Sequence, residues 1–307
     1  MKYEKPPLSL DDQVELLLRR GMSGDQALMR DRLAVVNYYR LSGYWHHLKN
    51  KDDDSFKQGT CFDTVWRQYS FDRALRLLVM DAIERIEVAV RTQLAYHHSR
   101  AFTDPFAYSD NPASLPGMSP GKRGEFLITL ADEMRRSRET FVEHFRAKYG
   151  DVHRCLPLWM ATEVMSFGSI LRFFRGVPRH VQNEIATHFR LPFAVFDSWL
   201  LTLNAIRNIC AHHGRLWNRS VAKPKMPFGK SYPEWQHPVE IRGDRIFGVL
   251  TLCNYCLDFI APQSSWPCRL RQLLSDSPHV PLLNMGFPEN WLESPLWKRA
   301  IEGGTRS

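Results

Sequence analysis

The chain has 307 residues, and 41 lysines and arginines against 33 aspartates and glutamates give it a formal net charge of +8 at pH 7. Its size allows one large domain or two small ones with a full core, and its positive charge favours an anionic partner. It has no apolar run of about 18 residues and no apolar segment after its first residues, which argues against membrane and secreted proteins and predicts a cytoplasmic one.

The first 58 residues are predicted to form a small N-terminal helical unit. Residues 10–20 combine an acidic start with an apolar stripe and a basic end, as a capped helix does. A second short helix is expected over residues 24–36. In residues 37–49, tyrosines and Trp45 cluster around a glycine, and they either form a stacking surface for RNA or pack against the main domain. We prefer packing.

The central part, residues 59–262, is predicted to be a helical bundle. Residues 62–100 have the most regular heptad-like spacing of apolar residues and are expected to form one long helix. Further helices are expected over residues 125–149, 158–174, 177–190, 193–214 and 246–260. Dense proline, glycine and serine between residues 104 and 124 predict an irregular loop.

The C-terminal extension, residues 263–307, is expected to mix helical and irregular structure. A short helix is indicated over residues 267–274, whereas the prolines and tryptophans of residues 278–297 fit no regular element. Strands are barely indicated anywhere in the chain, so we predict an all-α fold.

The segment RNICAHHGRLWNR at residues 207–219 combines an arginine and histidines at close spacing. A neutral imidazole can take the proton of an RNA 2′-hydroxyl, and a guanidinium can stabilise the charge that gathers on the attacked phosphate without a metal. Arg207 and His212 supply these two groups. A lone arginine and histidine are more often ordinary surface residues, and the neighbouring sequence decides between the two interpretations.

Helix geometry constrains how Arg207 and His212 act together. A separation of five residues places the two side chains about 140° apart on a helix. They would therefore meet through a distorted helix end near Gly214 or across the twofold axis of a dimer, and we favour the dimer. Asn204 and Asn208 extend a polar stripe that ends at His212. Leu203, Ile206 and Cys210 form the opposite, apolar face.

The surrounding sequence is strongly basic. No aspartate or glutamate occurs from Ser198 to Pro233, whereas six cations do: Arg207, Arg215, Arg219, Lys223, Lys225 and Lys230. Such a run predicts a positive surface for a polyanion. Four aromatic residues lie among or just beyond the cations, namely Trp217, Phe228, Tyr232 and Trp235. They could stack on unpaired bases or belong to the core, and for Trp217 both interpretations stay open.

Other motifs give little support for metal or nucleotide chemistry. The six cysteines are scattered, as in a protein with reduced thiols, and the single Cys-x-x-Cys at residues 253–256 lacks nearby ligands for zinc. Glycine-rich phosphate loops and Gly-x-Ser-x-Gly motifs do not occur. We expect no metal and no cofactor. Glu163, the only acid between Asp151 and Glu184, is expected to meet an arginine or histidine, because burying an unpaired carboxylate is costly.

Four segments together resemble one protein family. They are VVNYYRLSGYW at residues 35–45, YSFDRALRLLVMDAIERIEVAVR at 69–91, PLWMATEVMSFGSI at 157–170 and NAIRNICAHHGRLWNR at 204–219. In this order they are similar to the abortive-infection (Abi) family, AbiD/AbiF-like, which is grouped with the HEPN superfamily. The resemblance covers roughly residues 8–225.

The resemblance implies a HEPN-like helical bundle that forms a homodimer and cleaves RNA without a metal, leaving 2′,3′-cyclic phosphate ends. It makes Arg207 the arginine of the R-x4-6-H motif, Asn208 its polar second position and His212 its histidine. His213 also fits the spacing, so which of the two histidines is the base stays open. Glu163 and Asn204 are candidate supporting residues. The candidate RNA-binding residues are Arg215, Arg219, Trp217, Lys223 and Lys225.

The biological role that the family implies is bacterial defence, in which an infected cell stops its own growth before phage can spread. The leading hypothesis is thus a toxin endoribonuclease, with an antitoxin or a phage-derived trigger as a further partner. An alternative is a non-catalytic RNA-binding module that holds a noncoding RNA or regulates a partner. A third is a sensor that recognises a phage component through protein contacts.

Overall fold

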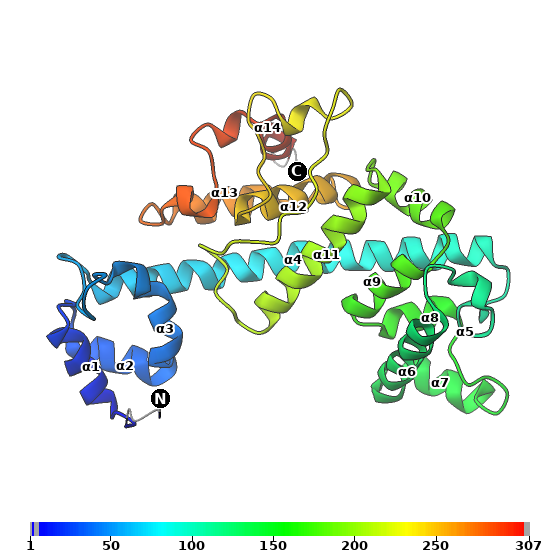
Figure 1. Cartoon of the computed structure of the whole chain (residues 1–307), viewed down its shortest axis with the longest axis horizontal. Coiled ribbons are helices and arrows are strands. Elements are labelled where there is room, and N and C mark those ends of the chain that lie inside the picture. Colours follow the sequence, from blue (N-terminus) through cyan, green and yellow to red (C-terminus); the bar gives the residue numbers. More distant parts are fainter. Residues whose placement is uncertain (1, 3–5, 304–307) are drawn as a thin grey trace. The chain divides into compact units, whose positions relative to one another are not determined.

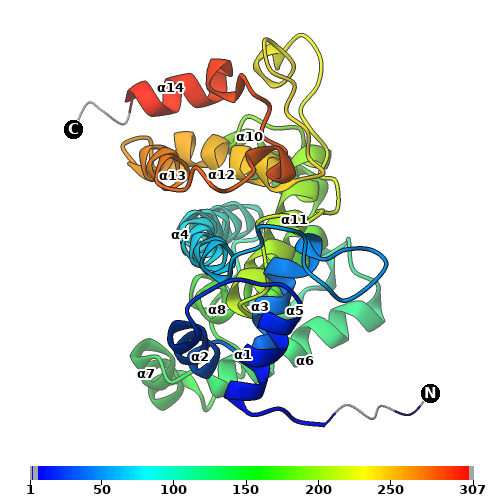
Figure 2. The ribbon, with the colours of Figure 1, turned by 90° about the vertical axis from the view of Figure 1, so that its left-hand side faces the viewer.

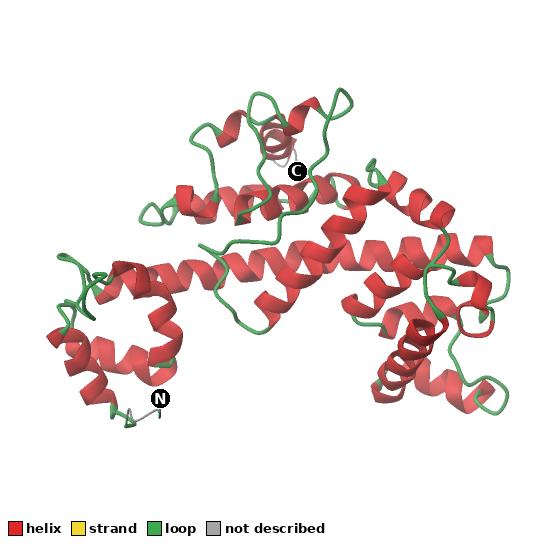
Figure 3. Cartoon of the chain, in the orientation of Figure 1, coloured by secondary structure: helices red, strands yellow, loops and turns green. Residues whose placement is uncertain are grey.

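The computed structural model describes residue 2 and residues 6–303, and its regular structure is helical (Figure 1). These residues form fourteen α-helices and five short 3-10 helices, and no strand occurs among them (Figure 3). The predicted all-α fold class is confirmed. The chain divides into two compact units: Met1–Arg76 with Arg271–Pro281 is unit 1, and Leu77–Leu270 with Leu282–Ser307 is unit 2.

Unit 1 is built from short, well-capped helices. They are α1 (Leu10–Arg19), α2 (Gln26–Val35), α3 (Tyr38–Trp45), η1 (His46–Leu48) and the first turns of α4 (Phe62–Ala101). Ser9 caps α1 by accepting a hydrogen bond from the N–H of Asp12, and Asp25 caps α2 in the same way. Tyr44 and Trp45 are buried. Packing, the preferred interpretation of this aromatic segment, is therefore confirmed for these two rings.

A buried polar network joins α3 to α4 inside unit 1. The hydroxyl of Tyr44 donates to Oδ2 of Asp72 at 2.5 Å, and Arg76 forms an ion pair with the same carboxylate one turn later. The guanidinium also donates to the Tyr44 hydroxyl at 3.3 Å. All three side chains are almost fully excluded from solvent. The ion pair therefore helps to compensate both buried charges.

Unit 2 holds the remaining helices. They are the rest of α4, α5 (Ala107–Asp110), η2 (Pro112–Ser114), α6 (Pro120–Arg136), α7 (Thr140–Tyr149), α8 (Leu158–Val164), α9 (Phe167–Gly176), α10 (Arg179–His188), α11 (Phe193–Ala211), η3 (Pro233–Trp235), α12 (Ile246–Ile260), η4 (Leu282–Met285), η5 (Trp291–Glu293) and α14 (Pro295–Gly303), together with the start of α13 (Trp266–Ser275). Helix α11 packs against α9, α10 and α12. Helix α12 in turn packs against α14, and the two lie side by side in Figure 2.

Two predicted helices are each divided in the structure. The segment 125–149 contains the end of α6 and all of α7, and the break follows Ser137, whose extended backbone ends α6. The segment 158–174 is broken at Ser166, whose hydroxyl caps α9 by accepting from the N–H of Ser169 at 3.2 Å. The predicted loop between residues 104 and 124 is also partly helical, since it includes α5, η2 and the first turn of α6.

The two units do not follow the predicted divisions after residues 58 and 262. The network around Asp72 places the first turns of α4 with the N-terminal helices. At the other end, the indole of Trp266 donates to the carbonyl oxygen of Leu78 at 2.7 Å, and α14 packs on α12. Most of the C-terminal extension is thus part of the core of unit 2.

Burial of His98 in unit 2 makes the stability of the protein depend on pH. The ring lies between Phe102 and Phe173, with centroid distances of 4.9 and 5.2 Å, and burial lowers its pKa to about 4. Above pH 6.5 the ring is neutral in both states, but below it the unfolded chain takes up a proton that the folded chain does not. Stability should therefore fall by about 1.4 kcal/mol per pH unit from 6.5 towards 4.

The variant His98→Leu tests this expectation. Urea unfolding followed by circular dichroism between pH 4 and 7 should give a shallower decline than the wild type on the acidic side, because the variant has no ring to protonate. An equally steep decline in both proteins would show that the loss of stability at acid pH comes from groups other than His98.

Candidate functional site

The predicted motif lies at the C-terminal end of α11. This helix starts after Pro192 and buries Leu203, Ile206 and Cys210, so the apolar face predicted for it is confirmed. On its other side Asn204 is half-buried and Asn208 is exposed. The helix ends at Ala211, and His212 is the residue that caps it. The motif is therefore not entirely helical, because its histidines lie in the turn that follows.

The turn after α11 has the hydrogen bonds of a Schellman motif. The N–H of His213 donates to the carbonyl of Cys210 at 3.0 Å, and the N–H of Gly214 donates to that of Ile209 at 2.7 Å. The left-handed position in such a turn usually belongs to glycine, but here it is His213, with a φ of 56°. Gly214 serves a different need, since a Cβ on it would lie 3.2 Å from the Ile209 carbonyl oxygen.

His213 thus adopts a backbone conformation that side chains disfavour. We expect His213→Gly to be more stable than His213→Ala by about 1 kcal/mol, because only glycine relieves the left-handed strain. Both variants lose the imidazole, so the comparison isolates the backbone term. Thermal unfolding of the two variants provides the measurement. Equal midpoints would mean that the turn does not strain the residue.

The three predicted catalytic residues are close in the chain but are not joined as one cluster. The half-buried Arg207 donates from Nη1 to Oδ1 of Asn208 at 3.4 Å, a long hydrogen bond. The imidazole of His212 is exposed, and no side-chain hydrogen bond links it to Arg207 in the described part of the chain. The histidine is therefore accessible to a large substrate, and the guanidinium is held against the amide.

The acid-free segment continues from this turn towards η3. Lys223 and Lys225 are exposed, whereas Arg215 and Arg219 are half-buried. The backbone of Lys225 is fixed to α11, because its N–H donates to Ser198 Oγ at 2.9 Å and its carbonyl accepts from the Trp199 indole at 2.8 Å. The predicted cations therefore lie on a segment that is anchored beside the helix of the motif.

A hollow of about 180 Å³ lies between α11 and residues 219–223. Leu201, Ala205 and Ile209 give it an apolar lining, and Arg219 and Lys223 add two cations. Chemically, such a hollow suits a group with an apolar face and a nearby negative charge, such as a base and its phosphate.

Two of the four aromatic residues of this region belong to the core. The rings of Trp217 and Trp235 are 0% and 1% exposed, so neither can take a base on its face. The predicted RNA-binding role of Trp217 is therefore wrong. Phe228 is 84% exposed and remains available for stacking, and the hydroxyl of Tyr232 donates to the carbonyl of Arg190 at 3.0 Å.

Glu163 lies at the end of α8 with an exposed side chain. The expectation that its carboxylate needs a cationic partner is wrong, because an exposed carboxylate keeps its hydration. Its carbonyl oxygen meets an arginine instead, since Arg91 donates to it at 2.8 Å. Arg91 also forms an ion pair with Glu87, one turn earlier on α4. No hydrogen bond or ion pair connects the Glu163 side chain with Arg207 or His212 among the residues described.

The described residues contain neither a cluster of metal ligands nor a helix that could span a membrane. No group of three histidine, cysteine or acidic side chains there is arranged to hold a metal ion. Burial raises the pKa values of the Cys253 and Cys256 thiols, which lie on α12. None of the helices in this part of the chain has both the length and the apolar character of a membrane span.

Comparison with known proteins identifies a family. The family model described as Abi-like protein matches residues 31–218, which is more than half of the chain and includes the whole of α11 with the turn that follows it. Neither the curated proteins nor the solved structures contain a significant match.

Proposed function

Since the chain belongs to the Abi-like protein family, we propose that it is a metal-independent endoribonuclease of the HEPN type that acts as a toxin in bacterial abortive infection. The observation that carries the proposal is the end of α11, where an exposed histidine follows a half-buried arginine beside an acid-free, cationic segment. In this reaction His212 takes the proton of the 2′-hydroxyl and later returns one to the leaving oxygen. Arg207 stabilises the charge on the phosphate.

The supporting residues have distinct parts in this proposal. The amide of Asn208, which accepts from Arg207, orients the guanidinium towards the phosphate. Asn204 lies one turn earlier on the same side of α11. The RNA backbone is attracted by four cations, namely Lys223, Lys225, Arg215 and Arg219. Binding of RNA should therefore weaken as the salt concentration rises. The exposed ring of Phe228 offers a face to an unpaired base.

We further propose that two copies form the active centre together, with Arg207 of one chain acting with His212 of the other. Within one copy, Arg207 donates to Asn208, and no hydrogen bond joins it to His212 in the described chain. A second copy could bring its own histidine to the arginine, and this favours a shared site.

A mixing experiment tests the shared site. Arg207→Ala and His212→Ala should each be inactive alone, but mixed dimers should regain about a quarter of the wild-type activity, since half of the dimers carry one intact pair out of two. The two variants are mixed in equal amounts, partially denatured and refolded together, so that their subunits exchange. Activity that stays at the level of the separate variants, although exchange is demonstrated, would contradict a shared site.

The non-catalytic RNA-binding module is the second candidate function, since the same cationic segment would serve it. Turnover separates the two functions. An enzyme cleaves an oligoribonucleotide in several-fold molar excess, whereas the module binds it and leaves it intact. Salt-sensitive binding without product under all tested triggers would favour the module and overturn the nuclease.

A further inference from the structure

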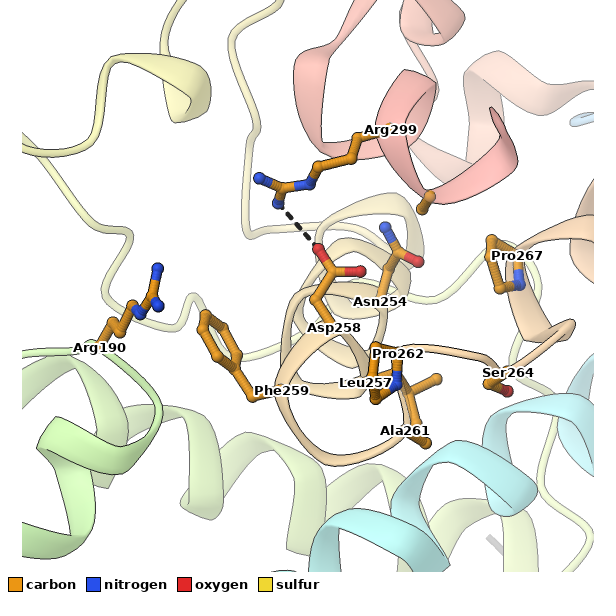
Figure 4. Close-up of a pocket in the computed structure, with 11 residues that line it drawn as sticks. Arg190, Asn254, Leu257, Asp258, Phe259, Ala261, Pro262, Ser264, Pro267 and Arg299 are labelled. Carbon is orange, nitrogen blue, oxygen red and sulfur yellow. Dashed lines mark hydrogen bonds and ion pairs between the residues drawn. The ribbon is translucent and has the colours of Figure 1, made fainter. Parts of the chain in front are cut away.

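A second polar site lies at the other end of α11. Arg190, in the turn between α10 and α11, contributes to a cavity of about 360 Å³ together with residues of α12 and α14 (Figure 4). The 19 residues of α11 separate this turn from His212, and a helix of that length spans about 28 Å. The cavity is therefore distinct from the candidate nuclease site.

One side of the cavity carries a net positive charge. Arg299 reaches in from α14 and forms an ion pair with Asp258 of α12 at 2.8 Å (Figure 4). Arg190 lies 5.4 Å from the centroid of the Phe259 ring and has no carboxylate partner among the described residues. Two guanidiniums and one carboxylate thus line the same space. The guanidinium of Arg190 is exposed and is therefore open to an anion from solution.

The backbone fixes Arg190 at the edge of this cavity. Its φ of 52° is left-handed, a conformation that favours glycine. Its N–H donates to the carbonyl of Thr187 at 2.9 Å, and its own carbonyl accepts from the hydroxyl of Tyr232 at 3.0 Å. Arg190 and His213 are the only two non-glycine residues in the described chain with positive φ, and such strain is concentrated at functional positions.

The rest of the lining is suited to an uncharged, partly apolar group. Pro262 and Pro267 lie away from Arg190 in Figure 4 and present apolar surfaces. Between the two sides, Oδ1 of Asp258 accepts no hydrogen bond from the described residues, since Arg299 binds Oδ2. Burial raises the pKa of this carboxyl group while Arg299 opposes the shift. A ligand that donates a hydrogen bond would satisfy the remaining oxygen.

From this arrangement we infer that the cavity binds a free nucleoside 5′-monophosphate. The phosphate pairs with Arg190 and Arg299, a hydroxyl or amino group donates to Asp258, and the base covers the proline side. Inorganic phosphate would leave the apolar side empty, and an aliphatic carboxylate would leave the Asp258 oxygen without a donor. The volume falls within the range of small-molecule sites.

Titration calorimetry of the full chain with the four nucleoside 5′-monophosphates tests this inference. At least one should bind, and its parent nucleoside should bind at least about tenfold more weakly, because it lacks the group that the guanidiniums recognise. Arg190→Gln should weaken the nucleotide by a similar factor. The matched control is Arg179→Gln, since Arg179 also lies over a phenylalanine, 3.8 Å from the Phe193 ring centroid, but outside the cavity. It should bind like the wild type.

Several results would overturn the assignment. They are no binding by the wild type, equal affinity for nucleoside and nucleotide, equal affinity for inorganic phosphate, or equal losses in Arg190→Gln and Arg179→Gln. Tighter binding of a 5′-phosphorylated oligoribonucleotide would also overturn it, in favour of an RNA end. The titration measures binding alone, so its outcome is independent of whether His212 cleaves RNA.

Discussion

Replacing His212 with alanine is expected to reduce RNA cleavage by about 10²- to 10⁴-fold, the usual contribution of a general base. The fold should be unaffected, since the imidazole is exposed at the end of α11 and no other described side chain forms a hydrogen bond with it. RNA binding should also persist, because the cations of residues 215–230 remain. The measurement is the rate of cleavage of a labelled oligoribonucleotide, with thermal unfolding and filter binding as checks on fold and affinity.

His213→Ala is the matched control for this prediction, since it removes the neighbouring imidazole from the same turn. Its rate should stay within a few-fold of the wild type if His212 is the base. The reverse pattern, in which His213→Ala loses cleavage and His212→Ala keeps it, would move the assignment to His213. Full activity in both variants would show that neither histidine of this turn is the general base.

Replacing Asp72 with asparagine should destabilise the protein by about 3–5 kcal/mol, because it removes the carboxylate that forms an ion pair with the buried guanidinium of Arg76. Asparagine keeps the shape of the side chain and can still accept from the hydroxyl of Tyr44, so the loss is electrostatic. The measurement is the free energy of unfolding in urea, followed by circular dichroism.

Asp11→Asn is the control for the buried pair. Asp11 also pairs with an arginine in unit 1, Arg30 at 2.9 Å, but the two side chains are 77% and 51% exposed. Exposed pairs contribute about 1 kcal/mol or less. A cost for Asp72→Asn no larger than that for Asp11→Asn would mean that water or another group compensates Arg76 in the folded state.

Two of the longer helices were predictable because their runs of closely spaced apolar residues favour a helix. Residues 62–100 and 246–260 match α4 and α12 within one residue at each end. The breaks at Ser137 and Ser166 were missed, since neither segment contains a proline or glycine at the break. The Ser166 cap has a local signal, a serine before an apolar run, but the same pattern also occurs inside helices.

The candidate site could be predicted only in part. The apolar face of α11 followed from its spacing, but the left-handed conformation of His213 did not, because the glycine beside it serves a close approach to Ile209 and not the positive φ. Sequence also does not distinguish a buried tryptophan from an exposed one when both are flanked by cations, as Trp217 shows. The cavity at Arg190 could not be predicted from a sequence motif, because its lining residues come from segments that are distant in sequence.

The most direct measurement of the proposed reaction is the chemistry of the ends that the wild-type protein leaves on RNA in excess EDTA. Attack by the 2′-hydroxyl predicts a 2′,3′-cyclic phosphate on one fragment and a 5′-hydroxyl on the other. It also predicts no cleavage where a 2′-deoxynucleotide replaces the nucleotide that is attacked. Fragments with 3′-hydroxyl and 5′-phosphate ends, or cleavage that appears only when a divalent metal is added, would contradict the account.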